Sequence, residues 1–406
     1  MRLITTVFLI LSLVAPAYAL TVEEAVQQAL MNNPDLRTLR FEETAADGRL
    51  EKALLFLINN PTLGGYYSKK DLPAEEGSGK FNNYGFNLSQ EFEIAGQRDA
   101  RIGVAEKELA RVKADIKDKE RVLIADVKTA FTKVLTGKKK NGLTREVVQL
   151  NEELLGYTKI RFQAGEVSAL EVNLSEVELS KAKKELLLSE RELREALLGL
   201  QGFIGLSPDL ALTLQGDLPS DLPMMPERDL KEALFRRPDA MATAFELERD
   251  RSALKLAEKQ IIPNITFGGF YDHDERRNVV GVESSIPLPF FDRKQAEKKE
   301  AYAKAEGAKI KSEGLKKTIE REVEQAFSSL NTAIAELSLF KKEIIVKAAE
   351  NLNLLNLAYK EGKVGFFAVR LAQKDTIEAQ FAYIEAQTRM QLALIAIEKT
   401  IGGPLK

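Results

Sequence analysis

Few side chains in this 406-residue sequence are placed to carry out chemistry, and the first candidates flank its single histidine. His273 stands between Asp272 and Asp274, and the chain has no cysteine. An Asp-His-Asp run could contribute metal ligands. A metal site, however, requires three or four ligands that are oriented by surrounding side chains. In a polar turn these three side chains are more simply solvated, so we predict no metal site here.

No other group of residues has the arrangement of a catalytic or cofactor site. Met224 and Met225 are adjacent and could contact a soft metal, but there is no cysteine and no third thioether nearby. One histidine in a surface turn cannot serve a Ser-His-Asp triad, and Gly-rich phosphate loops are absent. The Glu and Lys residues follow helical surface spacing, without the buried carboxylate pair that acid–base catalysis uses. We therefore expect neither an enzyme nor a cofactor.

The charge balance and the N-terminus indicate an exported protein. The formal net charge is -2, and nucleic-acid binding needs a basic excess, so we expect no nucleic-acid partner. Residues 1–19 have a secretory signal pattern, with an apolar run at 3–14 and small residues at 17–19. Cleavage after Ala19 would leave Leu20 at the mature N-terminus, so no lipid anchor on cysteine is expected. No later segment is apolar over the roughly 18 residues that a transmembrane helix needs.

The sequence contains the same series of landmarks twice, about 200 residues apart. The matching pairs are Asn33-Pro34-Asp35 with Arg237-Pro238-Asp239, Asn60-Pro61-Thr62 with Ile262-Pro263-Asn264, Gln97-Arg98 with Asp292-Arg293, residues 162–167 with 359–364, and Ile204-Gly205 with Ile401-Gly402. We predict a first repeat at 20–215, a linker at 216–226 and a second repeat at 227–406.

Each repeat is predicted to contain a helix, two strands and two long helices separated by a Gly turn. The first long helix of each repeat, at 98–162 and 294–359, would extend about 90 Å at about 1.5 Å per residue. Apolar residues recur in steps of four and three, which is the heptad seam of a coiled coil. In the second repeat the seam consists of Ile319, Val323, Ala326, Leu330, Ala333, Leu337, Phe340 and Ile344. The helices alone fit a coiled-coil rod and a duct equally well.

The four predicted strands lie at 61–70, 82–92, 263–272 and 278–288. Apolar residues alternate with polar residues and Gly in the last three, whereas the first shows the pattern least clearly because Tyr66 and Tyr67 are adjacent. Membrane-barrel strands have this period, although half-buried strands of soluble sheets share it. The residues predicted to face lipid are Tyr84, Phe86, Leu88, Phe92, Ile265, Phe267, Tyr271, Val280, Val282 and Ile286.

The number of strands favours the membrane interpretation. Four strands cannot close a barrel, and an open edge is not tolerated in hydrocarbon. Small membrane barrels begin at about eight strands, so several copies would have to contribute. Three copies supply about 3 × 4 = 12 strands, enough to enclose water. The predicted fold is mostly α with a small β part, internally duplicated. Long coiled-coil helices form a periplasmic barrel, and four membrane strands per chain complete a 12-stranded trimeric β-barrel.

With these features the chain resembles the TolC-type outer-membrane efflux proteins across residues 20–406. The resemblance rests on the opening run 20–25, on the paired Asn-Pro and Arg-Pro-Asp signals and on the two Gly turns. Residues 90–98 and 285–293 are similar to the cobalt-zinc-cadmium branch, whose members serve heavy-metal efflux by resistance-nodulation-division pumps.

The resemblance implies a homotrimer in the outer membrane of a Gram-negative bacterium, with most of its mass in the periplasm. Its partners would be outer-membrane lipid, a periplasmic adaptor (membrane fusion protein) and an inner-membrane proton-driven transporter. It would conduct substrates passively, heavy-metal cations among them. The resemblance places adaptor contacts at the two Gly turns, formed by Gly165, Glu166, Val167, Gly362, Lys363 and Val364.

Members of this family narrow their tunnel with carboxylates just after the second Gly turn. This chain has Ala368 and Leu371 at those positions, so the acidic ring is absent. We hypothesise that Glu171 and Arg370 take part in the closed constriction, as an ion pair. The alternative is that they are two solvated charges, since exposed pairs contribute only about 0–1 kcal/mol.

Two other functions remain open at this level. The chain could be a periplasmic coiled-coil structural protein with two soluble hairpins. It could also be the exit duct of a type I polypeptide secretion system, which has the same architecture.

Overall fold

The computed structural model describes residues 19–72, 79–210, 212–221, 237–275, 277–361 and 363–403. They belong to two compact units, unit 1 with Met1–Pro34, Glu120–Arg228 and Glu322–Lys406, and unit 2 with Asp35–Lys119 and Asp229–Arg321. Each unit draws on both sequence repeats, because elements of the first repeat pair with elements of the second. Residues 1–18 of the predicted signal peptide and 222–226 of the predicted linker lie outside the described residues.

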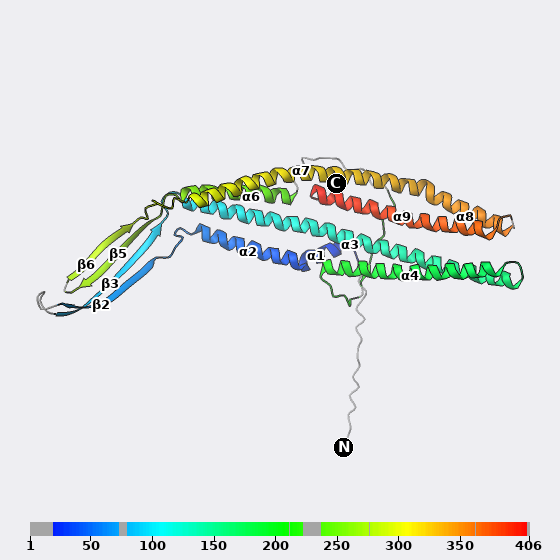
Figure 1. Ribbon diagram of the computed structural model, residues 1–406, viewed down its shortest axis with the longest axis horizontal. Coiled ribbons are helices and arrows are strands. Elements are labelled where there is room, and N and C mark those ends of the chain that lie inside the picture. Colours follow the sequence, from blue (N-terminus) through cyan, green and yellow to red (C-terminus); the bar gives the residue numbers. More distant parts are fainter. Residues whose placement is uncertain are drawn as a thin grey trace, which may run out of the picture. The chain divides into compact units, whose positions relative to one another are not determined.

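Unit 2 contains one antiparallel sheet of four strands in the order β2-β3-β5-β6 (Figure 1). The strands are β2 (Thr62–Leu72), β3 (Gly79–Phe92), β5 (Ile265–Asp274) and β6 (Arg277–Ser285). The central pair β3–β5 joins the two repeats. The prediction extended the last strand to residue 288, but β6 ends at Ser285. Pro287 has no backbone N–H for a ladder and restricts the residue before it, so Ile286 lies outside the strand.

The helices of unit 2 are α2 (Pro34–Leu54), α6 (Pro238–Lys259) and the first parts of α3 (Gln97–Gln163) and α7 (Gln295–Leu339). Pro34 and Pro238 occupy the first helical position, where the missing N–H leaves no bond unmade. The matching prolines of the two repeats therefore each mark the start of a helix.

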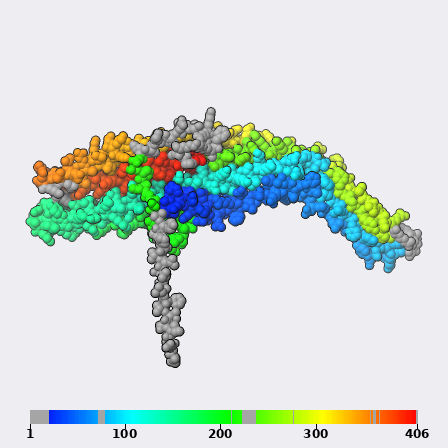
Figure 2. All heavy atoms as spheres, turned by 180° about the vertical axis from the view of Figure 1, so that it is seen from behind, coloured from blue at the N-terminus to red at the C-terminus, as the bar shows by residue number. Residues whose placement is uncertain are grey.

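Unit 1 contains two helical hairpins, α3 with α4 (Ala169–Ile204), and α8 (Ile345–Lys360) with α9 (Phe366–Ile401) (Figure 1). Figure 2 shows the same hairpins from behind, with α3 running from cyan to green, α4 in green, and α8 and α9 in orange and red. The short helix α1 (Val22–Asn32) packs against α4. The two-residue strands β1 (Ala19–Leu20) and β4 (Thr213–Leu214) pair in parallel, and Leu20 is buried.

The heptad seam of the second repeat is buried as predicted, but only as far as Leu337. There the helix changes to a π-turn, η2 (Phe340–Ile344), in which no residue is buried. The matching stretch of α3 remains α-helical. The seam prediction was therefore wrong for Phe340 and Ile344, because the wider π-turn rotates them out of the row.

Outside the seam the helix surfaces are charged. Ion pairs connect α3 with α4, among them Lys159 Nζ with Glu176 Oε1 at 2.8 Å and Lys183 Nζ with Glu152 Oε1 at 2.8 Å. Within the described ranges, every helix is too short or too polar to serve as a membrane-spanning helix.

The repeats coincide in detail where each long helix begins. The side-chain oxygen of Gln97 accepts a hydrogen bond from Ala95 N at 2.6 Å, and that of Gln295 accepts one from Arg293 N at 2.7 Å. In both repeats the donor is two residues earlier. The structural counterpart of Gln97 is therefore Gln295, three residues beyond the sequence match at Asp292.

Candidate functional site

The strand register places the predicted lipid-facing residues on one face of the sheet. Phe86 is opposite Tyr271, Tyr271 is opposite Val280, and Phe92 is opposite Ile265. Because side chains alternate along a strand, the whole predicted set from Tyr84 to Val282 shares this apolar face. Val282 is 91% exposed and Phe86 57%. Leu63 and Tyr67 of β2 lie on the same face and were missed, because adjacent tyrosines obscured the alternation.

The opposite face of the sheet is polar and carries more acidic than basic groups. Its charged residues on the described strands are Lys70, Glu91, Asp272, Asp274, Arg277 and Glu283. Asn83 organises the end of this face, since its amide donates to Asp274 Oδ1 at 2.6 Å and its oxygen accepts from Glu275 N at 3.0 Å. Among the described strands, the outer edges of β2 and β6 have no strand partner. Such edges favour pairing with a further chain.

A buried glutamine fixes the junction between sheet and helices. Gln97 is 2% exposed, and its amide donates to Ile262 O at 3.0 Å. Arg101 donates to Ala53 O at 2.8 Å and pairs with Glu93 at 2.7 Å. Gln97 and Glu93 belong to the stretch 90–98 that carries the branch resemblance. These two residues therefore have a structural role at the junction.

A cluster of partly buried charges lies farther along the helices of unit 2. Glu108 accepts hydrogen bonds from Arg111 Nη2 and Arg249 Nη1, each at 2.8 Å. The hydrogen bond from Arg111 is the main cause that lowers the pKa of Glu108 from 4.5 to about 2. Burial opposes this shift, and the bond from Arg249 lowers the pKa further. Burial raises the pKa of the neighbouring Asp115.

The first Gly turn closes the α3–α4 hairpin. Gly165 has a φ of +75°, which favours glycine, and Glu166 N donates to Arg161 O at 2.9 Å. Arg161 Nε also donates to Glu166 Oε2 at 2.9 Å. Glu166 is exposed and Val167 is half-buried.

The second Gly turn has the same backbone bond, from Lys363 N to Ala358 O at 2.8 Å. Lys363 is exposed and pairs with Glu361 at 2.7 Å, and Val364 is half-buried. The predicted turn residue Gly362 lies outside the described residues. The two turns therefore present backbone and charged groups at the ends of their hairpins, and adaptor contact by them remains a prediction.

Arg370 of α9 contacts the other hairpin, but through a different residue from the one proposed. Its guanidinium donates to Asn151 Oδ1 at 3.2 Å and to Glu178 Oε2 at 3.4 Å. It also donates to Gln373 Oε1 at 3.2 Å, and Asn151 and Gln373 are buried. Within the described chain, Glu171 makes no ion pair with Arg370. Within one chain the acidic partner of Arg370 is Glu178, two helical turns beyond Glu171, and the part of Glu171 and Arg370 in a closed constriction stays a hypothesis.

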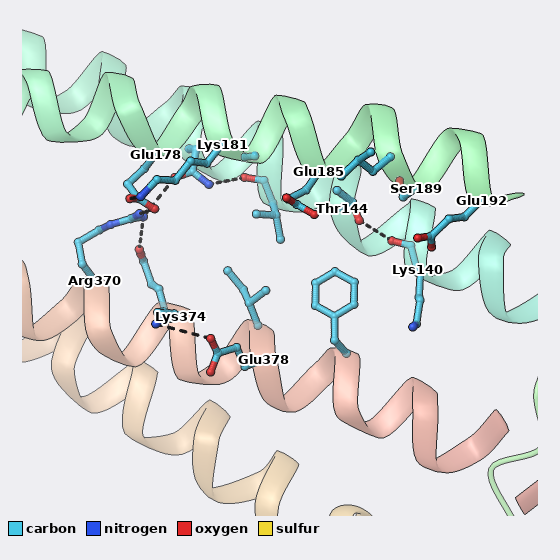
Figure 3. Close-up of a pocket in the computed structure, with 17 residues that line it drawn as sticks. Lys140, Thr144, Glu178, Lys181, Glu185, Ser189, Glu192, Arg370, Lys374 and Glu378 are labelled. Atoms are coloured by element: carbon cyan, nitrogen blue, oxygen red, sulfur yellow. Dashed lines mark hydrogen bonds and ion pairs between the residues drawn. The ribbon is translucent and has the colours of Figure 1, made fainter. Parts of the chain in front are cut away.

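A cavity of about 550 Å³ lies beside Arg370, bounded by α3, α4 and α9 (Figure 3). Lys140, Lys181, Glu185 and Lys374 line it with charge. Phe381 contributes an apolar side chain to the lining. Lys140 Nζ lies 2.9 Å from Glu385 Oε1, so a second ion pair connects α3 with α9. The two hairpins of unit 1 are thus separated by a groove and joined by charged residues.

The Asp-His-Asp run does not converge on a point. His273 lies on the apolar face, stacked on Tyr84 at a ring distance of 4.9 Å, and its Nδ1 lies 2.7 Å from Asn278 Oδ1. Asp272 and Asp274 lie on the opposite face. Across the described part of the chain, no three His, Cys, Asp or Glu residues are grouped to hold a metal. Met224 and Met225 lie outside the described residues.

Comparison with known families gives a match in both halves of the chain. A family described as outer membrane efflux protein matches residues 25–206 and again residues 230–403. The two matched segments correspond to the two repeats seen in the sequence.

Individual relatives and solved structures agree with this match. The cobalt-zinc-cadmium resistance protein CzcC of Cupriavidus metallidurans is 24% identical over 94% of this chain and 90% of its own length. The pyoverdine export outer membrane protein OpmQ of Pseudomonas aeruginosa is 24% identical over 94% of this chain and 85% of its own length. The solved outer-membrane channel OprN has a TM-score of 0.82 at 20% identity, covering 94% of this chain and 90% of that one. A structure of CusC has a TM-score of 0.81 at 16% identity, covering 94% of this chain and 92% of that one.

Proposed function

The chain belongs to the outer membrane efflux protein family, and we propose that it is the passive outer-membrane exit duct of a tripartite efflux pump. The main support is the four-stranded sheet, which has an apolar face, a polar face and, among the described strands, two edges without a partner. A membrane sheet must close on itself, since no water in the hydrocarbon can satisfy its edge groups. Three copies would supply about 3 × 4 = 12 strands, with the apolar face toward lipid and the polar face toward water.

The helical hairpins support contact with a periplasmic adaptor. Their Gly turns, at Gly165, Glu166, Val167, Lys363 and Val364 as well as Gly362, would meet the adaptor. The groove between the α3–α4 and α8–α9 hairpins could receive its helices. Through the adaptor the duct would connect to an inner-membrane proton-driven transporter.

Heavy-metal cations are the proposed cargo. A relative named for cobalt, zinc and cadmium resistance matches nearly the full chain, and the polar face of the sheet carries an acidic excess that would favour cations. Transport would need no chemistry within this chain, and we assign it no enzymatic role. Its site would be the Gram-negative outer membrane, reached after signal cleavage behind Ala19 and without a lipid anchor.

Loss of the gene tests this function directly. A strain without it should become sensitive to Co²⁺, Zn²⁺ and Cd²⁺, and the wild-type gene should restore growth. If the strain became sensitive to organic compounds alone, the proposed role as an exit duct would stand, but the proposal that metal cations are its cargo would be overturned. Unchanged tolerance to metals and to organic compounds, in a strain without a second duct, would overturn the function.

A further inference from the structure

Each strand of the sheet carries a glycine on the polar face, directly opposite a larger side chain. The pairs are Gly64 with Asn87, Gly85 with Tyr66 on one side and Asp272 on the other, Gly268 with Glu283, and Gly281 with Phe270. In an antiparallel sheet, directly opposed side chains are nearest neighbours. The glycines therefore leave space where the larger residues need it.

The larger side chains occupy that space. A Cβ atom on Gly281 would lie 2.5 Å from Cζ of Phe270, and one on Gly85 would lie 2.5 Å from Cε1 of Tyr66. A Cβ on Gly268 would lie 2.9 Å from Oε1 of Glu283. Side chains on a strand ordinarily stand roughly perpendicular to the sheet. Here they lie across the glycine of the neighbouring strand and cover it, as in aromatic rescue of strand glycines.

Gly269 provides the contrast. It lies in β5 on the apolar face, and the nearest atom to a Cβ placed there is Gly281 O at 3.8 Å, an ordinary contact distance. An alanine would fit at Gly269 without moving any neighbour. At Gly281, one strand away, it would displace the Phe270 ring.

We infer that Gly64, Gly85, Gly268 and Gly281 set the bore of the pore by letting the large residues of its wall lie flat. The inference rests on the proposed function, because the polar face lines a pore only in the closed barrel. Without the glycines, Tyr66 and Phe270 would be turned toward the axis in every copy. The exit for a bulky solute would then narrow, although the charge of the wall would be unchanged.

The absence of tryptophan allows a site-specific test. In the Phe270→Trp trimer, the indole reports whether residue 270 lies against the wall. Adding Gly281→Ala should shift its emission to longer wavelength and increase its quenching by aqueous acrylamide. Adding Gly269→Ala, the matched control, should change neither. Equal quenching in all three proteins would overturn the inference.

Two further measurements separate the possible failures. If Gly281→Ala prevents trimer assembly, the double variant Phe270→Ala/Gly281→Ala should restore it, and failure to do so would count against the inference. Brominated lipids should not quench Trp at position 270. Strong quenching by them would place the polar face against lipid and would overturn the proposed barrel itself.

Discussion

Arg370 of α9 lies 3.4 Å from Glu178 of α4, so one guanidinium joins the two helical hairpins of unit 1. The arginine side chain is 20% exposed, and its other partners, Asn151 and Gln373, are buried. Hydrogen bonds from a charged group to buried partners contribute more to the stability of the folded chain than an exposed ion pair does. This connection must loosen if the hairpins separate when the duct opens.

Arg370→Ala is therefore expected to destabilise the trimer and to favour the open duct. Buried Asn151 and Gln373 would lose their donor, at a cost of about 1–3 kcal/mol. Thermal unfolding should show the loss, and single-channel recording should show a higher open probability. Lys374→Ala is the control, because Lys374 pairs with Glu378 on its own helix at 3.7 Å. Equal behaviour of the two variants would contradict the connection.

The constriction hypothesis for Glu171 makes a separate prediction. Glu171→Ala should raise conductance if its carboxylate narrows the closed entrance. Trimer stability should change little, because Glu171 has no ion-pair partner among the described residues. Conductance identical to wild type would show that Glu171 does not take part in the constriction. The prediction for Arg370 would not be affected.

Charges introduced on the two faces of β6 should have different effects. Val282→Lys would place an ammonium toward lipid, which costs about 2–4 kcal/mol near the membrane midplane. Val279→Lys, on the polar face, would place it in water. The yield of folded trimer in the outer membrane should fall for the first variant alone. A comparable fall for Val279→Lys would contradict the face assignment.

Alanine should have opposite effects at two glycines of unit 1. Gly165 has a φ of +75°, and an L-residue in the left-handed region costs about 1–2 kcal/mol. Gly142 is inside α3 with open space around it, where alanine gains about 1 kcal/mol in helix propensity. Protease sensitivity of the hairpin ends should rise for Gly165→Ala and fall or stay constant for Gly142→Ala. Greater protease sensitivity of Gly142→Ala than of Gly165→Ala would contradict the left-handed conformation of Gly165 in the turn.

The Glu108 cluster predicts a pH-dependent difference. The pKa of Glu108 is lowered to about 2, so its stabilising effect is complete above 4.5 and disappears as the pH falls through 2. Glu108→Gln should lower the thermal midpoint near pH 7, and its difference from wild type should shrink toward pH 2. Asp115→Asn should lower the thermal midpoint near pH 7 by less than Glu108→Gln does. Burial raises the pKa of Asp115, which means that its charged form is costly in the folded state. A Glu108→Gln difference that does not change with pH would refute the assignment.

Local patterns in the sequence predicted much of the fold. Period-two alternation located β3, β5 and β6 and, less clearly, β2, whose adjacent tyrosines interrupt the pattern. The pairs of prolines and glycines located the ends of the helices. The end of β6 was misjudged because apolar residues continue past Ser285, whereas Pro287 removes a backbone donor. The seam was extended too far because Phe340 and Ile344 keep the heptad spacing, which cannot reveal a π-turn.

The contacts between elements were harder to predict. Glu171 and Glu178 are seven residues apart on one helix, so both follow the same heptad position. Only the placement of α9 against α4 selects Glu178 as the partner of Arg370. The role of the sheet glycines, likewise, could not be predicted without the strand register, which pairs Gly281 with Phe270.

Mass measurement of the detergent-extracted protein, followed by recording in planar lipid bilayers, tests whether the chain forms an outer-membrane duct. We expect a stable trimer that is released from the outer membrane only by detergent and that conducts ions. A monomer that is soluble without detergent and never inserts into lipid would contradict this expectation.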